Sequence, residues 1–217
     1  MLMIRHLSKR FSEVPVFTDV SLDLAAGEFV ALLGESGVGK STLLNCVAGL
    51  EDADRGEVHI AGTPLATLDE AGRAALRRQS LGFVFQAFHV LPHLTVAENV
   101  ELPLRLLGRP DAERVESLLQ AVGLGGLGAR LPAQLSGGQL QRVAIARAVV
   151  HAPRLILADE PTGNLDPTTA ERVLGVLREQ VRGSGAACLL VTHSAAAAAA
   201  ADRVLRLTPN GIEAAAP

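Results

Sequence analysis

The sequence predicts an α/β fold in which a core of alternating strands and helices carries an antiparallel β flank and an inserted α-helical subdomain. Three observations predict this class. The apolar run 29–33 leads through a glycine-rich loop into an apolar helical pattern, which is the order strand, loop, helix. Two more apolar runs, 155–158 and 187–191, flank the amphipathic helical pattern 168–181. Between 87 and 134 prolines punctuate helical segments without a strand pattern, which indicates the inserted subdomain.

The composition is that of a folded globular protein. Of 217 residues, 48% are hydrophobic and 20% are charged, with no block of like charge. The formal net charge is −3, whereas affinity for nucleic acid depends on clustered Lys and Arg. We therefore expect no nucleic-acid partner.

The apolar runs are too short for a membrane span, which needs about 20 residues. Arg5 and Lys9 interrupt the N-terminal stretch where a signal peptide would need an apolar core. We expect a cytoplasmic chain that does not insert directly into a membrane. Cys46 and Cys188 are isolated among apolar residues, which predicts buried free thiols.

The first 28 residues predict the β flank. Residues 2–4 and 20–24 have strand patterns, and 26–28 form the closing turn. Phe11 lies between these strands in a chain with only 3% aromatic residues. Its ring either stacks on a nucleotide base or packs in the core, and spacing alone leaves both open.

The glycine-rich loop predicts a phosphate-binding site. Its residues are Gly34, Glu35, Ser36, Gly37, Val38, Gly39, Lys40, Ser41 and Thr42. The pattern G-x-x-x-x-G-K-S/T lets backbone N–H groups surround a phosphate at the N-terminus of the next helix. We expect Lys40 to reach the β- and γ-phosphates and Ser41 to ligate Mg²⁺. The alternative is a glycine-rich turn in which Lys-Ser is incidental.

A strand at 56–60, a charged surface helix at 69–78 and a short strand at 81–85 follow. The last strand ends in Gln86, whose amide can contact a metal or a water without adding charge. The alternative for Gln86 is an ordinary surface glutamine.

Within the inserted stretch, helices are expected at 95–102 and 111–122, with Gly123 as a C-cap. An apolar cluster follows Gln86 and is either core or a partner-binding face. Its members are Phe88, Val90, Leu91, Leu94 and Val96.

A long helix through Val150 begins at Ser136, a natural N-cap. Gly137 and Gly138 leave backbone N–H groups bare, so this helix start resembles a second anion-binding site, followed by Gln139. An ordinary capped helix is the alternative.

Polar residues end two of the apolar strands. Asp159 and Glu160 follow 155–158, where α/β sheets place ligands. We expect Asp159 to hold Mg²⁺ and Glu160 to polarise the water that attacks the γ-phosphate. Strand 187–191 ends in Thr192 and His193, a histidine that in isolation is more often a surface residue.

Taken together, these segments resemble the ATP-binding subunit of an ABC transporter. The family's motifs occur in order along nearly the whole chain: the phosphate loop GESGVGKST, the glutamine loop FVFQ, the signature LSGGQLQR, the acidic strand LILADEP, the D-loop GNLD and the switch histidine VTH. The resemblance implies a P-loop NTPase core of the ABC ATPase type that binds ATP and Mg²⁺ and hydrolyses ATP. It implies one domain, 1–217, with a nucleotide-binding core (1–86 and 153–217) and a helical subdomain (87–152) bearing the signature.

The resemblance also implies roles for individual residues. ATP binding induces a head-to-tail homodimer in which Ser136 to Gln139 of one subunit close on ATP held by the other. Phe11 stacks on adenine, Asp166 of the D-loop belongs to the nucleotide site, and His193 contacts the γ-phosphate. The implied catalytic residues are Lys40, Glu160 and His193. The implied metal-site residues are Ser41, Gln86 and Asp159, and Gln86 also links that site to the membrane partner.

Two sequence segments, GFVFQAFHVLPHLTVAENVELPL and ADEPTGNLD, are similar to those of ATPases of the lipoprotein-releasing and macrolide-export subfamily. This implies an integral membrane permease as partner and a location at the inner face of the cytoplasmic membrane. An ATPase of an envelope-regulating complex that transports nothing remains an alternative. A DNA-repair ATPase head is disfavoured, because 87–134 is too short and proline-rich for its coiled coil.

Two features depart from the family. His193 is followed by Ser194, where an acid is common, and then by seven alanines, 195–201. We expect the helix there to persist, because alanine is the best helix former, but to offer little specific contact. The base-stacking aromatic is Phe11 rather than tyrosine, which keeps the π-face and loses the hydroxyl.

Overall fold

The computed structural model describes residues 1–163 and 165–214. Asn164, part of the turn expected at 164–166, lies outside the described residues.

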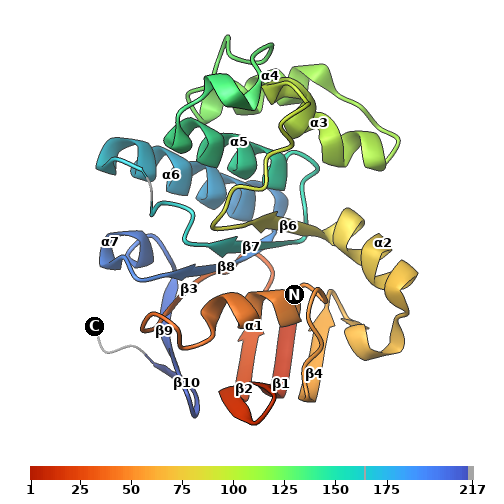
Figure 1. Ribbon diagram of the computed structural model, residues 1–217, viewed down its shortest axis with the longest axis vertical. Helices are drawn as coiled ribbons and strands as arrows, with labels where there is room; N and C mark the ends of the chain where they lie inside the picture. The colour runs from red at the N-terminus through yellow and green to blue at the C-terminus, as the bar shows by residue number, and fades with distance from the viewer. Residues whose placement is uncertain (164, 215–217) are drawn as a thin grey trace.

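Ten strands of the described chain form two sheets (Figure 1). The antiparallel sheet has the order β2-β1-β4-β5. Its strands are β1 (Leu2–Phe11), β2 (Val14–Leu24), β4 (Arg55–Ile60) and β5 (Thr63–Pro64). The larger sheet has the order β10-β9-β3-β8-β7-β6 and is parallel except for β10. Its strands are β3 (Phe29–Leu33), β6 (Leu81–Val84), β7 (Leu155–Asp159), β8 (Ala187–Thr192), β9 (Arg203–Thr208) and β10 (Gly211–Ala214).

The helices form layers on the two faces of the larger sheet (Figure 1). Helix α1 lies between the two sheets, whereas α3, α4, α5 and α6 cover the opposite face of the larger one. The α-helices are α1 (Lys40–Val47), α2 (Glu70–Ser80), α3 (Val96–Leu106), α4 (Ala112–Ala121), α5 (Gly137–Val149), α6 (Pro167–Ser184) and α7 (Ala195–Ala198). Short 3₁₀ turns occupy Leu65–Thr67 and Pro132–Gln134.

Strand β7 shows why its sequence is apolar throughout. Leu155 and Leu157 pack in the core that contains α1, and Ile156 and Ala158 pack in the core under α3 to α6. Successive side chains of a strand point to opposite faces, so a strand covered on both faces has no polar position. The central parallel strands are buried for this reason.

The order of the parallel strands positions the site. Strands β3, β8, β7 and β6 are neighbours, and their carboxyl ends lie at one edge of the sheet. The phosphate loop, Thr192-His193, Asp159-Glu160 and Gln86 follow these four ends in turn. Four segments far apart in the sequence therefore converge at one edge.

The predicted α/β class and its main elements are confirmed, but the β flank was underestimated. The expected strands 2–4 and 20–24 cover only the parts of β1 and β2 that lie far from their connecting turn. The two strands extend through residues 2–11 and 14–24. The pairing of β1 with β2 shifts register beyond Ile4, and His6 and Asp19 have positive φ of 48° and 58°. Such irregularities interrupt the alternating pattern by which a strand is recognised in sequence.

Two helices also differ from expectation. Helix α3 was expected to end at 102 but continues through Pro103 to Leu106, because Leu104 is buried in the core and its packing offsets the lost hydrogen bond. The alanine run forms only the four-residue α7, and Ala197, Ala198 and Ala200 are buried rather than free of contact. The chain must turn there into β9, whose start is held by Asp202 N–H to the Phe29 carbonyl at 2.7 Å.

The apolar cluster after Gln86 divides between its two interpretations. Val96 is fully buried and Val90 packs partly against the same core, as the core interpretation requires. Leu91 is exposed at the surface. Cys46 and Cys188 are buried free thiols, as predicted.

Candidate active site

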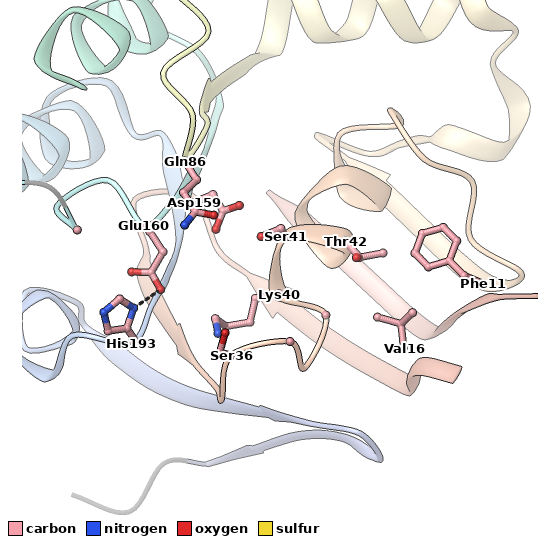
Figure 2. A pocket seen from close by; sticks show the side chains of 13 residues that line it. Phe11, Val16, Ser36, Lys40, Ser41, Thr42, Gln86, Asp159, Glu160 and His193 are labelled. Atoms are coloured by element: carbon pink, nitrogen blue, oxygen red, sulfur yellow. Dashed lines mark hydrogen bonds and ion pairs between the residues drawn. The ribbon is translucent and has the colours of Figure 1, made fainter. Parts of the chain in front are cut away.

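A cavity of about 710 Å³ lies where the antiparallel sheet meets the carboxyl edge of the parallel strands (Figure 2). Phe11 and Val16 line one end, and Glu160 and His193 line the other, with the phosphate loop between them. The lining comprises Phe11, Val16, Ser36, Gly37, Gly39, Lys40, Ser41, Thr42, Gln86, Asp159, Glu160, Gly163 and His193. The cavity therefore brings together residues from every predicted motif except the signature and Asp166.

The phosphate loop adopts a conformation that only glycine accommodates at its key positions. Gly37 and Gly39 have φ of 83° and 98°. A Cβ on Gly39 would lie 2.4 Å from Cγ1 of Val16, so the loop packs directly against β2. Lys40 opens α1, and its Nζ donates to the carbonyls of Gly34 and Glu35 at 2.8 Å each. The cationic side chain and the helix N-terminus thus face the same space.

Asp159 ends β7 and is buried, with 7% of its surface exposed. Burial raises the pKa of its carboxyl group, while a hydrogen bond from Ser41 opposes that shift. The neighbouring protein groups therefore compensate the carboxylate charge only in part. Such a site favours a cation.

Glu160 is held from two sides. Its Oε1 lies 2.7 Å from Nδ1 of His193, and its Oε2 accepts a hydrogen bond from the Thr192 hydroxyl at 3.0 Å (Figure 2). Its side chain is 11% exposed, whereas that of His193 is 73% exposed. The backbone of Glu160 has φ of 47°, unusual for a residue other than glycine, and its N–H donates to the Val191 carbonyl at 2.9 Å. The contacts with β8 hold this conformation in place.

Phe11 ends β1 and is 51% exposed beside the cavity. The Lys9 ammonium lies 4.9 Å from the centroid of its ring, within cation–π range. That ammonium also donates to Glu51 Oε1 at 2.6 Å and to the Asp52 carbonyl at 2.7 Å. An exposed aromatic held at a cavity rim fits the base-stacking interpretation better than the core interpretation.

Several predicted site residues do not line the cavity. Gly34, Glu35 and Val38 belong to the loop but are not among its lining residues. The Asp166 side chain caps α6 by accepting the Thr169 N–H at 3.1 Å.

The signature residues Ser136 to Gln139 begin α5, away from the cavity of their own chain. Ser136 and Gln139 form a reciprocal capping box, in which Gln139 N–H donates to Ser136 Oγ at 3.3 Å and Ser136 N–H to Gln139 Oε1 at 2.8 Å. The N-cap is confirmed, whereas the phosphate contact of this segment stays a prediction.

Thr192, Val16 and Gly163 are site residues that sequence reasoning missed. Thr192 had a usable signal, because a polar residue ends a buried strand next to His193. Val16 had none, because β2 was expected to begin only at residue 20. Gly163 lies three residues beyond Glu160, and its N–H closes a turn by donating to the Glu160 carbonyl.

Comparison with known proteins assigns the class. A family model described as ABC transporter matches residues 17–163. The chain is 48% identical over 196 residues to the lipoprotein-releasing system ATP-binding protein LolD of Maricaulis maris, covering 89% of this chain and 86% of that protein. It is 47% identical over 215 residues to the uncharacterized ABC transporter ATP-binding protein YbbA of Escherichia coli K12, covering 96% and 94%.

Solved structures agree. The dimeric bacterial ABC transporter cassette MJ0796 superposes with a TM-score of 0.92 at 37% identity, covering 98% of this chain and 97% of that one. A post-hydrolysis dimer of MJ0796 with ADP and Pi gives 0.91 at 35% identity, with 100% of both chains covered.

The chain belongs to the ABC transporter family and has the ABC ATPase fold. It is an ATP-binding subunit of such a transporter and hydrolyses ATP. None of the helices in the part of the chain that the structure describes has the length and hydropathy needed to cross a membrane.

Proposed function

We propose that this subunit binds ATP·Mg²⁺ in the cavity of Figure 2, hydrolyses it within a head-to-tail homodimer and drives a membrane permease of the lipoprotein-release or export type. One observation carries the proposal. The phosphate loop, Gln86, Asp159, Glu160 and His193 converge from four neighbouring strand ends on one cavity. This convergence supports the proposal, because phosphoryl transfer needs a phosphate-binding loop, a metal site and a water-activating group around one triphosphate.

The loop fits a polyphosphate. Its glycine conformations turn backbone N–H groups toward the cavity, and the α1 N-terminus adds the positive end of the helix dipole. Lys40 exchanges its hydrogen bonds to the Gly34 and Glu35 carbonyls for the β- and γ-phosphate oxygens. A side chain on Gly39 would collide with Val16 and close this cradle.

The residues around Asp159 fit Mg²⁺. Asp159 is a buried carboxylate in need of a cation, and Ser41 beside it opposes the rise in its pKa. The described residues contain no group of three His, Cys, Asp or Glu side chains that would form a protein cage. Mg²⁺ typically takes few protein ligands and keeps waters and phosphate oxygens, so Ser41, Asp159 and Gln86 suffice. When bound, Mg²⁺ supplies positive charge that offsets the charge on the phosphates.

Glu160 acts as the general base in this proposal. Thr192 and His193 fix its carboxylate at the end of the cavity opposite Phe11, where the γ-phosphate lies if adenine stacks on that ring. The carboxylate then accepts the proton of the attacking water. His193, largely exposed on the cavity side, contacts the γ-phosphate.

The second phosphate contact comes from another copy. Ser136, Gly137 and Gly138 begin α5 outside the cavity of their own chain, so they reach a nucleotide only across a subunit interface. The two MJ0796 structures, which are dimeric, support this arrangement. In this arrangement the helical subdomain, 87–152, supplies the signature, and Asp166 lies near the interface.

The adenine end of the proposal is tested by Phe11→Ala. Loss of the stacking contact is expected to weaken ATP binding by on the order of 1 kcal/mol while kcat at saturating ATP stays nearly unchanged. Titration calorimetry with ATP measures the first effect, and inorganic tripolyphosphate is the control ligand, because it lacks the base. An unchanged ATP affinity would remove Phe11 from the site.

A groove of about 300 Å³ between α2, β6, α3 and the C-terminal end of α5 suits the permease. Arg78 makes one side of it cationic, whereas Arg77 there is paired with Glu70, and Leu106, 57% exposed, makes the other side apolar. We assign to it a cytoplasmic segment of the permease with apolar and acidic residues. Lipoprotein-releasing ATP-binding proteins among the relatives support that class of permease.

Membrane association should therefore depend on the permease. We expect the subunit to sediment with membranes that contain its permease and to remain in the supernatant with protein-free vesicles of the same lipids. Arg78→Glu is expected to weaken co-sedimentation, whereas Arg182→Glu, at an exposed site on α6, is the matched control. Equal sedimentation with bare vesicles would contradict the proposal. Vesicles holding the complete transporter then decide whether lipoprotein moves, or whether ATP hydrolysis only transmits force.

A further inference from the structure

Arg147 binds the backbone of the loop that carries Gln86. Its two terminal nitrogens donate to the Phe88 carbonyl at 2.9 Å and to the His89 carbonyl at 2.7 Å. Both carbonyls belong to bulky residues with positive φ, 58° and 48°. Two successive non-glycine residues in this region are unfavourable by themselves, so surrounding contacts must hold them.

In the described part of the chain, the Arg147 guanidinium has no carboxylate that would compete for its donors. Among the described residues Arg147 forms no ion pair within 4.0 Å, although it is half-buried and burial lowers its pKa. A guanidinium that is removed from water normally pairs with a carboxylate, because the carboxylate compensates its positive charge. Here its polar contacts in the described chain are the two strained carbonyls.

The other end of the loop is held by aromatic contacts. The Phe85 ring stacks on Phe83, with centroids 3.9 Å apart, and meets the His89 ring edge-on at 4.6 Å. The His89 N–H closes a tight turn on the Ala87 carbonyl at 2.6 Å. Gln86 lies in the preceding, overlapping turn, which the Phe88 N–H closes on the Phe85 carbonyl at 3.3 Å, and its side chain lines the cavity. The position of Gln86 therefore depends on the conformation at 88 and 89.

Arg147 also ties this loop to the signature segment. It belongs to α5, a continuous helix whose N-cap is Ser136, about 16 Å away at 1.5 Å per residue. The backbone between these residues is helical throughout and its second half is buried, so the helix moves as one piece. A shift of the helix at Ser136 thus reaches the carbonyls of Phe88 and His89.

We propose that Arg147 is a positioning residue that holds the Gln86 loop in its strained conformation and couples it mechanically to the signature end of α5. The coupling rests on the proposed function, because it uses the assigned roles of Gln86 and Ser136. The hold on the loop itself depends only on the geometry around Arg147.

Arg147→Met tests the hold directly. Without its two charged hydrogen bonds, backbone amides of 83–91 are expected to exchange deuterium on the order of tenfold faster in the nucleotide-free protein. Arg147→Lys should give an intermediate rate, because an ammonium lacks the planar fork, and it carries the same comparison if the Met variant does not fold. Arg178→Met is the control, since Arg178 likewise donates to two successive carbonyls, those of Ala199 and Ala200. An unchanged exchange rate at 83–91 in Arg147→Met and Arg147→Lys would overturn the proposal.

The role of the loop is tested by the Mg²⁺ dependence of ATP hydrolysis, with Gln86→Ala measured in parallel. Both Arg147→Met and Gln86→Ala should raise the Mg²⁺ concentration for half-maximal rate, while ATP affinity in excess chelator stays unchanged. A rise for Gln86→Ala alone would overturn the positioning role of Arg147. Faster exchange in Arg147→Met with no rise for either variant would support the hold and overturn the proposed role of Gln86.

Discussion

Replacing Glu160 with glutamine is expected to slow ATP hydrolysis by about 10²- to 10⁴-fold, the typical loss when a general base is removed. The amide keeps the shape of the carboxylate and its contacts with Thr192 and His193, but it cannot accept the proton of the attacking water. ATP should still bind, because the phosphate loop and Phe11 are unchanged and the substitution removes a negative charge beside the γ-phosphate. Phosphate release under saturating ATP·Mg²⁺ measures the rate, and calorimetry measures the affinity.

Glu179→Gln provides the matched control, since Glu179 is an exposed carboxylate on α6 outside the cavity. It should hydrolyse ATP at the native rate. The same native rate in Glu160→Gln would show that Glu160 is not the base. With hydrolysis this slow, the ATP-bound Glu160→Gln protein should elute as a dimer and the ADP-bound protein as a monomer.

Ser136→Arg, added to Glu160→Gln, is expected to abolish that ATP-dependent dimer. The substitution places a long side chain at the helix start that meets the partner's γ-phosphate in the head-to-tail arrangement. It also removes the N-cap of α5, which typically costs about 1 kcal/mol of stability. Size-exclusion chromatography with ATP, at protein concentrations where Glu160→Gln alone is dimeric, measures the loss.

Loss of a cap must be separated from loss of the interface. Asp111→Arg is the matched control, because Asp111 caps α4 by accepting the Arg114 N–H and also receives an arginine at a helix start. It should remain dimeric in the Glu160→Gln background. A dimer that survives Ser136→Arg would contradict the signature-to-nucleotide arrangement for the isolated chain.

The strained backbone at Glu160 helps to orient its carboxylate. A positive φ of 47° directs the side chain toward β8, where Thr192 is fully buried and donates its hydroxyl. The base is thus oriented by a neighbouring strand of the sheet, 32 residues further along the chain. Preorganisation of this kind keeps the carboxylate in place before substrate arrives.

Local sequence was sufficient wherever a feature depends on residues close together in the chain. The strand, loop and helix around Lys40, the start of a helix at Thr95, the N-cap Ser136 and the acids ending β7 were all predicted correctly. Glycine conformations, capping and apolar runs are short-range effects, so a few neighbouring residues carry them. The class of fold and the identity of the main site residues follow from such segments.

Long-range contacts decided the rest. No clear local pattern marks strands β9 and β10, the parts of β1 and β2 next to their connecting turn, or the passage of α3 through Pro103. The contact of Val16 with Gly39 and the hydrogen bonds from Arg147 to Phe88 and His89 also have no local signal. Val16 and Gly39 are 23 residues apart, and Arg147 is about 58 residues from its two partners. The sequence by itself determined which segments become strands, caps and phosphate loop. Only the tertiary structure decided which strands pair and which side chains meet at the site, because these depend on packing energies summed over distant residues.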